Sequence, residues 1–415
     1  MRLKCRHCGS ELHLPFLDLG NAPPSNAYLT EEAVRTPEIW FPLRILVCEN
    51  CWLVQTEDHA GREALFTQDY AYFSSFSTTW LAHAQRYVDQ MIERFGLSAS
   101  SCVAEVAAND GYLLQYVKQA AIPCYGIEPT ASTASAARSK GIDIVKRFFG
   151  VELANELVQT GKQADLMIAN NVLAHVPDIN DFVSGFTRLL KPHGVVTFEF
   201  PHLLRMVQES QFDTAYHEHY SYLSLTAVQR IFAASGLTVF DAEELPTHGG
   251  SLRVFAQCTD TGVHEHSSAV LSLLERETEA GMTTPAFYQA FQRRAEKVKD
   301  DLVLLLIDAK RRGLKVGAYG AAAKGNTLLN FAGIRPDLLP YVVDKNPAKQ
   351  NKFMPGSRVP IVDEAHLKAD RPDLILILPW NLREEVMAQL AYVREWGGQF
   401  VTAVPALEVS KAKTA

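Results

Sequence analysis

The feature that most constrains this fold is a regular alternation of short apolar runs with helical patterns between residues 101 and 258. This alternation is typical of a doubly wound α/β sheet, with parallel strands and helices on both faces. Two further apolar runs, Leu237–Leu245 and Ser251–Gln257, are separated only by a loop, which predicts an antiparallel hairpin at the end of the sheet. The parallel strands are predicted at Cys102–Ala107, Cys124–Glu128, Ile142–Val145, Asp165–Ala169 and Val195–Phe200.

The alternation resumes near the C-terminus, which predicts a second α/β domain. Its strands are expected at Lys315–Tyr319, Tyr341–Val343, Leu374–Leu378 and Phe400–Val404. Between the two domains, apolar residues recur at helical spacing from Ser267 to Arg312, which predicts one or two long bridging helices. At about 150 residues per domain, a chain of 415 residues has room for two or three domains. We expect an N-terminal module at 1–65, the first α/β domain at 66–265, a helical linker at 266–312 and the second α/β domain at 313–415.

Charge and hydropathy exclude several classes of protein. The formal net charge of −7 and the lack of a long basic run argue against a nucleic-acid partner, because phosphate contacts need clustered Lys and Arg. No segment reaches the roughly 18 consecutive apolar residues that a membrane helix needs. The start, MRLKCRHCGSEL, lacks the apolar region of a signal peptide. We therefore expect a cytoplasmic protein that acts on small molecules and binds neither membranes nor nucleic acids.

The N-terminal module contains two Cys-x-x-Cys pairs, Cys5 with Cys8 and Cys48 with Cys51. In a cytoplasmic protein this spacing favours metal binding over disulfide formation. Four thiolates can surround Zn²⁺ as a tetrahedron with no open position, so the zinc is expected to be structural. The alternative is two buried thiol pairs that never meet. Two nearby histidines offer replacement ligands, His7 and His13.

The first predicted strand carries an acidic residue, Glu105, and turns into a helix through Asn109, Asp110 and Gly111. This is an acidic variant of the strand–loop–helix unit that binds nucleosides, and glycine lets the backbone approach the ligand. A carboxylate suits a cationic ligand better than a pyrophosphate, which prefers glycine and a helix N-terminus. S-adenosylmethionine, with its ammonium and sulfonium groups, fits such a site.

Further candidate cofactor residues follow the next strands. Glu128 ends the second strand about twenty residues on, where a carboxylate can accept both ribose hydroxyls. Both acids could instead be surface residues. Phe148 is a candidate neighbour of the adenine ring, although such aromatics are often core. Asn170 and His175 follow the strand Asp165–Ala169, at the edge where open α/β sheets bind ligands; a lone histidine there is as often structural.

The most informative string is FDTAYHEHY, residues 212–220. Two imidazoles, one carboxylate and two phenols between Tyr216 and Tyr220 are hard to explain by packing, and they predict an acid/base cluster. A metal site at His217 and His219 would need further ligands, and none is obvious.

Two other strings carry weaker signals. Tyr70 and Tyr72 precede the sheet; they could belong to the core, yet a tyrosine face beside a sulfonium is favourable through cation–π attraction. The string VGAYGAAAKGNT, residues 316–327, turns from strand to helix through small residues and includes Lys324 and Asn326. It suits an anionic phosphate but lacks the G-x-G-x-x-G of dinucleotide sites.

Over nearly the whole chain, these strings resemble the sugar C-3′ methyltransferase family, which makes branched deoxysugars for natural-product glycosides such as antibiotics. Tyr216-His-Glu-His219 looks like the family's Tyr-x-Glu-His element, and His248-Gly-Gly-Ser-Leu-Arg253 is similar to its His-Gly-Gly turn. The resemblance implies an α/β fold with a class I methyltransferase Rossmann-like sheet, preceded by a small zinc-binding module and followed by a second Rossmann-like domain. One departure is Ala107, which stands where many relatives have glycine.

The resemblance also implies a reaction: C-methylation, dependent on S-adenosylmethionine, at C-3′ beside the keto group of a nucleotide-linked 4-keto-deoxysugar, with dTDP as the expected carrier. His219 is the expected base, Tyr216 and His175 would hydrogen-bond the enolate, Tyr70 would close the site, and Glu218 would orient an imidazole or contact sugar hydroxyls. The substrate residues it implies are His248, Gly249, Ser251, Arg253, Lys324, Asn326 and Lys352. A monomer is favoured.

Three alternatives stay open. The enzyme could methylate another sugar carbon, or it could be an O- or N-methyltransferase of the same fold. From another class, the chain could be an inactive zinc-containing scaffold. The dense cluster from Tyr216 to His219 argues against the scaffold.

Overall fold

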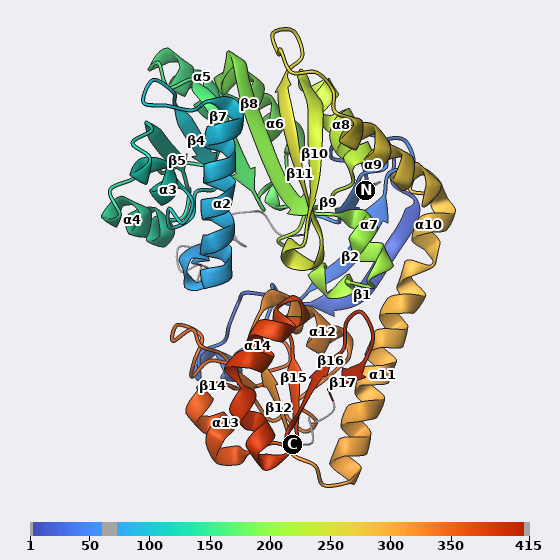
Figure 1. Cartoon of the computed structure of the whole chain (residues 1–415). Coiled ribbons are helices and arrows are strands. Elements are labelled where there is room, and N and C mark those ends of the chain that lie inside the picture. The colour runs from blue at the N-terminus through green and yellow to red at the C-terminus, as the bar shows by residue number, and fades with distance from the viewer. Residues whose placement is uncertain (1–2, 60–72, 411–415) are drawn as a thin grey trace.

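The computed structural model describes residues 3–59 and 73–410, and it places them around three sheets (Figure 1). The expected fold class is confirmed: a small N-terminal module precedes a large α/β domain, and a second α/β domain follows. Within the described part of the chain, every helix is too short or too polar to cross a membrane.

The middle sheet has seven strands in the order β10-β11-β8-β7-β4-β5-β6. Its five parallel strands are β4 (Val103–Val106), β5 (Cys124–Ile127), β6 (Asp143–Val145), β7 (Ala164–Asn170) and β8 (Leu190–Pro201). The predicted hairpin is present as β10 (Leu237–Leu245) and β11 (Ser251–Cys258), and β11 lies antiparallel between β8 and β10. All four residues of β4 are buried, as expected for a strand covered on both faces.

Helices cover both faces of this sheet (Figure 1). The helix that leads into it, α2 (Thr78–Phe95), begins where the Ser77 hydroxyl accepts the Trp80 amide, and it ends at Gly96 in a left-handed conformation. The other helices are α3 (Leu114–Gln119), α4 (Ala131–Ser139), α5 (Val151–Gln159), α6 (Ile179–Leu189), α7 (Leu203–Gln208) and α8 (Leu225–Ala234).

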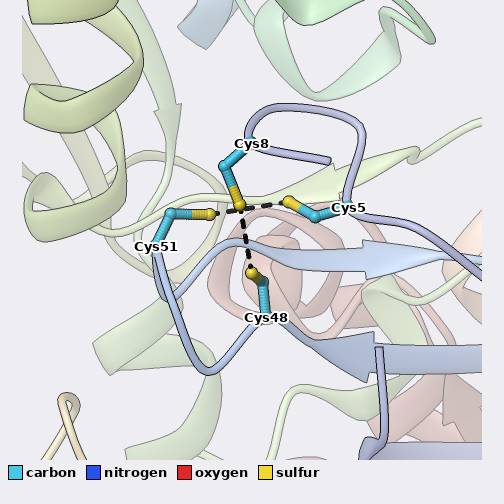
Figure 2. A group of neighbouring side chains, drawn as sticks. All are labelled: Cys5, Cys8, Cys48 and Cys51. Carbon is cyan, nitrogen blue, oxygen red and sulfur yellow. Dashed lines mark hydrogen bonds between the residues drawn. The ribbon is translucent and has the colours of Figure 1, made fainter. Parts of the chain in front are cut away.

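The N-terminal sheet consists of β1 (Leu14–Ala22), β2 (Phe41–Val47), β3 (Val54–Thr56) and β9 (Ser221–Tyr222). Its fourth strand comes from the middle of the chain and pairs antiparallel with β3. The four cysteines of the module converge on one point (Figure 2). The module is therefore joined through backbone pairing to the segment that follows the predicted acid/base cluster.

The predicted one or two bridging helices are three in the structure: α9 (Ser268–Glu279), α10 (Pro285–Gln289) and α11 (Phe291–Arg311). Gly281 takes a φ of 85° after α9, and Pro285 starts the next helix, so the chain cannot continue as one helix there. The long α11 runs along the C-terminal domain (Figure 1).

The C-terminal sheet has the order β14-β13-β12-β15-β16-β17, and only β17 is antiparallel to its neighbour. Its strands are β12 (Val316–Tyr319), β13 (Val342–Val343), β14 (Ile361–Val362), β15 (Leu374–Ile377), β16 (Gln399–Thr402) and β17 (Glu408–Val409). Its helices are α12 (Ala323–Phe331), α13 (Glu364–Asp370) and α14 (Arg383–Gln389).

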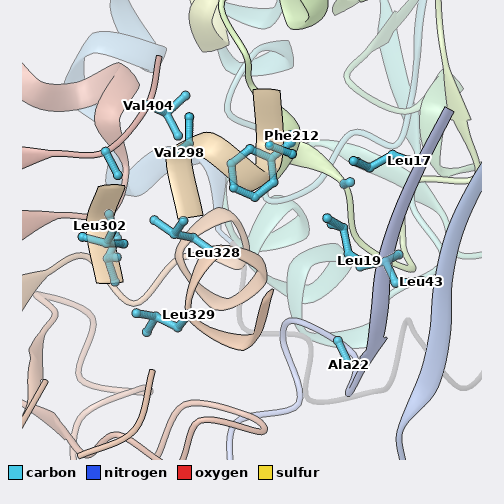
Figure 3. Close-up of a cluster of buried hydrophobic side chains, with 14 of the residues drawn as sticks. Leu17, Leu19, Ala22, Leu43, Phe212, Val298, Leu302, Leu328, Leu329 and Val404 are labelled. Carbon is cyan, nitrogen blue, oxygen red and sulfur yellow. The ribbon is translucent and has the colours of Figure 1, made fainter. Parts of the chain in front are cut away.

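One continuous hydrophobic core joins the N-terminal sheet, the linker and the C-terminal domain (Figure 3). Phe212 of the middle domain is fully buried in it, beside α11 and α12. The other labelled members of this core are Leu17, Leu19, Ala22, Leu43, Val298, Leu302, Leu328, Leu329 and Val404. Because this shared packing holds the domains together, loops at the carboxyl ends of both parallel sheets line one cavity.

Candidate active site

The four cysteines of the N-terminal module form a compact cluster in which all sulfur atoms lie within 4.8 Å of one another. The Cys5 and Cys51 sulfurs are 3.5 Å apart, as are those of Cys8 and Cys48. A tetrahedral zinc with bonds of about 2.3 Å separates its sulfur ligands by roughly 3.8 Å, so the cluster fits Zn²⁺. The candidate replacement ligands lie elsewhere, because His7 bonds Asn180 and His13 contacts Glu11.

A cavity of about 1660 Å³ opens between the middle and C-terminal domains. Eleven predicted site residues line it: Asn109, Glu128, Phe148, Asn170, His175, Tyr216, Glu218, His219, His248, Arg253 and Lys324. Seven others lie outside its lining: Glu105, Asp110, Gly111, Gly249, Ser251, Asn326 and Lys352. Tyr70 and Tyr72 fall outside the described residues.

On the middle-domain side, the cavity wall includes Glu128, which directly follows β5. Its Oε2 accepts the Asn109 amide at 2.9 Å, and its Oε1 accepts the Thr130 amide at 2.9 Å. The side chain of Asn109 in turn accepts the Ser74 amide at 3.0 Å. Burial raises the pKa of Glu128, although these amides favour its charged form. A carboxylate at this place can accept the hydroxyls of a ribose diol.

The other predicted residues of the acidic loop, Glu105, Asp110 and Gly111, lie outside the cavity lining. Glu105 is buried, and the loss of solvation raises its pKa well above the usual range. Asp110 pairs with Lys140 at 3.3 Å. Gly111 has a φ of 75°, and a Cβ there would meet the Ile142 side chain at 2.4 Å, so only glycine fits.

Ala107, which stands where the family resemblance leads us to expect glycine, has a φ of 59°. This left-handed conformation costs an alanine about 1 kcal/mol or more relative to glycine. The turn is nevertheless retained, because the Ala107 amide donates to the Ile127 carbonyl at 2.8 Å.

His219 lies in the cavity wall as a neutral imidazole. Its Nδ1 is 2.8 Å from the Thr214 carbonyl oxygen, which can only accept, so Nδ1 carries the proton and Nε2 keeps its lone pair. Burial lowers the pKa of His219 well below its usual value, and the nearby His175 and Lys324 act in the same direction. The ring therefore has the protonation state and tautomer that a general base requires.

Two aromatic rings hold this imidazole. The Tyr216 ring centroid is 3.9 Å from that of His219, and the His175 centroid is 4.6 Å away. His175 Nδ1 lies 2.9 Å from the Glu218 carbonyl oxygen, so this imidazole too has Nδ1 as its donor. Burial lowers the pKa of His175 to about 4, which leaves it uncharged at neutral pH.

Glu218 directs its carboxyl group toward the N-terminal module. Its Oε2 accepts the side-chain amide of Asn26 at 2.7 Å, while both imidazoles beside it bond main-chain carbonyls instead. This geometry favours contact with substrate hydroxyls over orientation of an imidazole. Burial raises the pKa of Glu218 to about 7. His217, by contrast, packs on Phe41 and bonds the Pro42 carbonyl outside the cavity lining.

His248 belongs to a turn with three consecutive positive φ values, 54° at His248, 89° at Gly249 and 113° at Gly250. A Cβ at Gly249 would meet the Trp380 ring of the C-terminal domain at 2.4 Å, which explains the glycine. Burial lowers the pKa of His248 to about 4. Ser251 stabilises the turn, because its hydroxyl donates to the Thr247 carbonyl.

A buried ion network supports the same turn. Glu199 accepts bonds from His83, Arg253 and Thr247 at 2.9, 2.9 and 3.0 Å. Arg253 also lies 4.6 Å from the centre of the Tyr87 ring. His83 and Glu199 carried no sequence signal, because each stands alone in a helix or strand far from the other partners.

From the C-terminal domain, Lys324 enters the cavity near the start of α12. Its Nζ donates to the Asn381 side chain at 3.1 Å and lies 4.4 Å from the Trp380 ring centre, two uncharged partners. Burial lowers its pKa to about 8. Asn326 is buried within α12, and Lys352 is partly exposed away from the cavity, whereas its neighbours Lys345 and Lys349 line it.

The seven-stranded sheet with its inserted antiparallel strand, and the acid at the end of β5 facing a large cavity, define a class I methyltransferase domain. Family models agree: a zinc binding domain matches residues 5–66, a methyltransferase domain 80–242, and a C-methyltransferase C-terminal domain 246–405. The C-methyltransferase NovU of Streptomyces niveus is 32% identical over 411 residues, 99% of this chain and 97% of NovU. The chain belongs to this C-methyltransferase family.

Solved structures match part of the chain at lower sequence identity. The magnesium protoporphyrin IX methyltransferase of Synechocystis PCC 6803 has 15% identity and a TM-score of 0.34, over 42% of this chain and 82% of that chain. The 1,6-didemethyltoxoflavin-N1-methyltransferase of Burkholderia thailandensis has 15% identity and a TM-score of 0.36, over 50% of this chain and 96% of that chain.

The family models and the cysteine cluster confirm both expected cofactors. The enzyme depends on S-adenosylmethionine, and its cysteine cluster is a zinc site. Glu128, Asn109 and Asn170 are the cavity residues best placed to hold S-adenosylmethionine, because they stand at the carboxyl ends of β4, β5 and β7.

Proposed function

We propose that this enzyme methylates C-3′, the carbon beside the keto group of a nucleotide-linked 4-keto-deoxysugar, with dTDP as the carrier. The observation that carries the proposal is the neutral His219 imidazole, whose Nε2 lone pair is available on a ring that lines the cavity. Removing a proton from carbon requires such a base, whereas O- and N-methylation act on atoms that already carry lone pairs.

In the proposed reaction, the C-3′–H bond breaks, the proton moves to His219 Nε2, and the electron pair delocalises onto the keto oxygen as an enolate. Tyr216 flanks the base and would stabilise that oxygen by a hydrogen bond from its hydroxyl. His175 also packs beside the base, and its one ring proton is donated to the Glu218 carbonyl. S-adenosylmethionine supplies the methyl group on its sulfonium and leaves as S-adenosylhomocysteine. A new C–C bond forms, the ketone is restored, and the proton on His219 returns to solvent.

The C-terminal domain would hold the nucleotide diphosphate. Lys324 offers a positive charge that the nearby Asp213 carboxylate favours, and its Nζ bonds the uncharged Asn381 side chain. It lies in the first turn of α12, where main-chain amides favour anions. His248 and Arg253 would contact the sugar from the middle-domain side. We infer that two ligands enter one cavity from opposite domains, which brings the reacting atoms together.

A direct test offers the purified enzyme S-adenosylmethionine and a panel of nucleotide-linked 4-keto-deoxysugars. The expected result is a mass gain of one methyl group on the sugar, located at C-3′ by NMR. A second candidate is methylation at another carbon next to the ketone. The similarity to the C-methyltransferase NovU supports methylation on carbon but does not say which carbon is methylated. The same NMR spectrum distinguishes the two, and a product methylated on oxygen or nitrogen would contradict both.

A further inference from the structure

We propose that the N-terminal zinc module is part of the catalytic apparatus, because two of its residues, Thr56 and Asn26, position the adjacent residues His219 and Glu218. The inference rests on the proposed function, in which His219 is the base and Glu218 contacts the substrate. Both positioning residues lie more than 150 residues away from their partners in sequence, so only the fold brings them together.

Thr56 fixes the main chain of the base. Its hydroxyl donates to the His219 carbonyl oxygen at 2.6 Å, and its amide donates to the Tyr220 carbonyl at 3.1 Å. Immediately beyond, Gln55 and Val54 pair with Ser221 and Tyr222 as β3 and β9. All these groups are buried, so the bonds hold the backbone of His219 while its ring remains in the cavity wall.

The zinc site anchors the strand that carries Thr56. Gln55 donates from its side-chain amide to the Cys5 sulfur at 3.3 Å, and its side-chain oxygen accepts the Arg6 amide at 2.9 Å. The Arg6 guanidinium then donates to the Thr56 carbonyl at 2.9 Å. A continuous series of hydrogen bonds therefore connects a metal ligand to the main chain of the base. Groups that bond metal ligands in this way orient the surrounding structure.

Asn26 fixes the side chain of Glu218 from the loop after β1. Its amide nitrogen lies 2.7 Å from Glu218 Oε2, and Asn26 itself lines the cavity. The same loop reaches the C-terminal domain, where the Tyr28 hydroxyl donates to the Ala321 carbonyl at 2.6 Å and Leu29 pairs with Phe353. Glu218 is thus held by a segment that contacts both domains bordering the cavity.

The Thr56 arm is tested by Thr56→Val, which keeps the shape and removes the hydroxyl. We expect kcat to fall about 10- to 100-fold, because small displacements of a base are costly, while KM for both ligands stays within about two-fold. Thr56→Ser should restore most of the rate. Thr187→Val is the matched control, since the Thr187 hydroxyl also donates to a main-chain carbonyl, that of Ser235 at 2.7 Å, away from the cavity. A normal kcat for Thr56→Val would overturn this arm. So would a Thr56→Ser variant whose kcat is as low as that of Thr56→Val.

The Asn26 arm is tested by titrating Glu218 itself with carboxyl-labelled glutamate and NMR, using Glu218→Gln to assign the signal. The Asn26 amide holds the pKa of Glu218 down against the effect of burial, so Asn26→Ala should raise that pKa by about one unit. The other titratable groups around this residue, Tyr28, His175 and His219, are unchanged in the variant. An unchanged Glu218 titration would overturn the assignment.

These readouts separate the inference from the function on which it rests. The Glu218 titration needs no substrate, so it reports on Asn26 even if every 4-keto-sugar proves inert. Zinc content, measured by elemental analysis, should stay at about one per chain in all variants. If Thr56→Val lost its zinc, the kinetic effect would be structural, and the positioning role would be rejected.

Discussion

The rings of Tyr216 and His219 lie against each other with centroids 3.9 Å apart, and His219 bonds a carbonyl only five residues before it in the chain. The segment from Thr214 to His219 is therefore folded back on itself, and the side chains of Tyr216 and His219 reach the same cavity. This local compaction allows one short string to supply the proposed base and its proposed neighbouring donor.

His219→Asn should abolish methyl transfer and leave the affinity for S-adenosylmethionine nearly unchanged. The proposed contacts to S-adenosylmethionine come from other residues, Glu128 and Asn109, and loss of a general base typically costs about 10²–10⁴-fold in rate. Methyl transfer and solvent-deuterium exchange beside the ketone give two readouts. If the variant still exchanged that proton at the wild-type rate, the base would lie elsewhere, and His175 would be tested next.

Glu218→Gln should stabilise the enzyme more at pH 8 than at pH 5. Burial raises the pKa of Glu218 to about 7, above its ordinary value of about 4.5, so the folded state holds this proton where the unfolded chain has released it. The stability that this proton linkage provides is complete below pH 4.5, the ordinary pKa of the side chain, and it is lost as pH rises through the folded-state pKa of about 7. A glutamine has no proton to release, so the Glu218→Gln enzyme does not lose this stability.

The measurement is the difference in Tm between Glu218→Gln and the wild-type enzyme at the two pH values. By the linkage relation the difference corresponds to about 2–3 kcal/mol at most. Glu384→Gln, which alters a highly exposed carboxylate, is the control and should show little change between pH values. A Tm difference for Glu218→Gln that is the same at both pH values would refute the raised pKa.

Much of the fold could be predicted because its signals are local. The terminal hairpin follows from two apolar runs separated by one loop, and the zinc cluster from the spacing of Cys5, Cys8, Cys48 and Cys51. The number of linker helices could not be predicted from periodicity alone, since Gly281 and Pro285 interrupt a pattern that otherwise continues. The domain boundaries and the individual site roles stay predictions.

The missing parts of the site share one property: each depends on contacts between distant segments. Asn26, Thr56, His83 and Glu199 are single polar residues without a motif, and their partners are far away in the sequence. Likewise, Ser221–Tyr222 joins the N-terminal sheet although neighbouring residues belong to the middle domain. A two-residue strand has no periodicity to detect.

Ala107→Gly should raise the free energy of unfolding by about 0.5–1 kcal/mol. Glycine relieves the left-handed strain at a φ of 59°, and this gain exceeds the entropy that glycine adds to the unfolded chain. Chemical denaturation measures the change. Ala104→Gly in the buried strand β4 is the control, and it should destabilise because glycine there removes packing without relieving strain. Equal destabilisation by both substitutions would contradict the strain at Ala107.

Cys48→Ser should remove zinc and lower stability, because metal binding contributes directly to the folding of small cysteine knuckles. Elemental analysis should find about one zinc per wild-type chain and much less in the variant. Cys258→Ser provides the control, since Cys258 lies in β11, outside the cluster. Finding no zinc in carefully prepared native protein would disprove the metal site.

Lys324→Met should weaken nucleotide-sugar binding at least ten-fold and leave S-adenosylmethionine binding unchanged. The lysine stands in the first turn of α12 and faces the cavity from the C-terminal domain, whereas the proposed S-adenosylmethionine residues lie on the opposite wall. Losing a charge-assisted bond to a phosphate commonly costs about 1.5–3 kcal/mol, which corresponds to that change in affinity. Calorimetric titration of each ligand measures it, and Lys352→Met, whose lysine lies outside the cavity lining, is the matched control. The loop Gly317–Asn326 lacks a dinucleotide fingerprint, so NAD(P) should bind weakly or not at all. Tight NAD(P) binding that nucleotide-sugars fail to displace would assign the C-terminal domain to a redox cofactor instead.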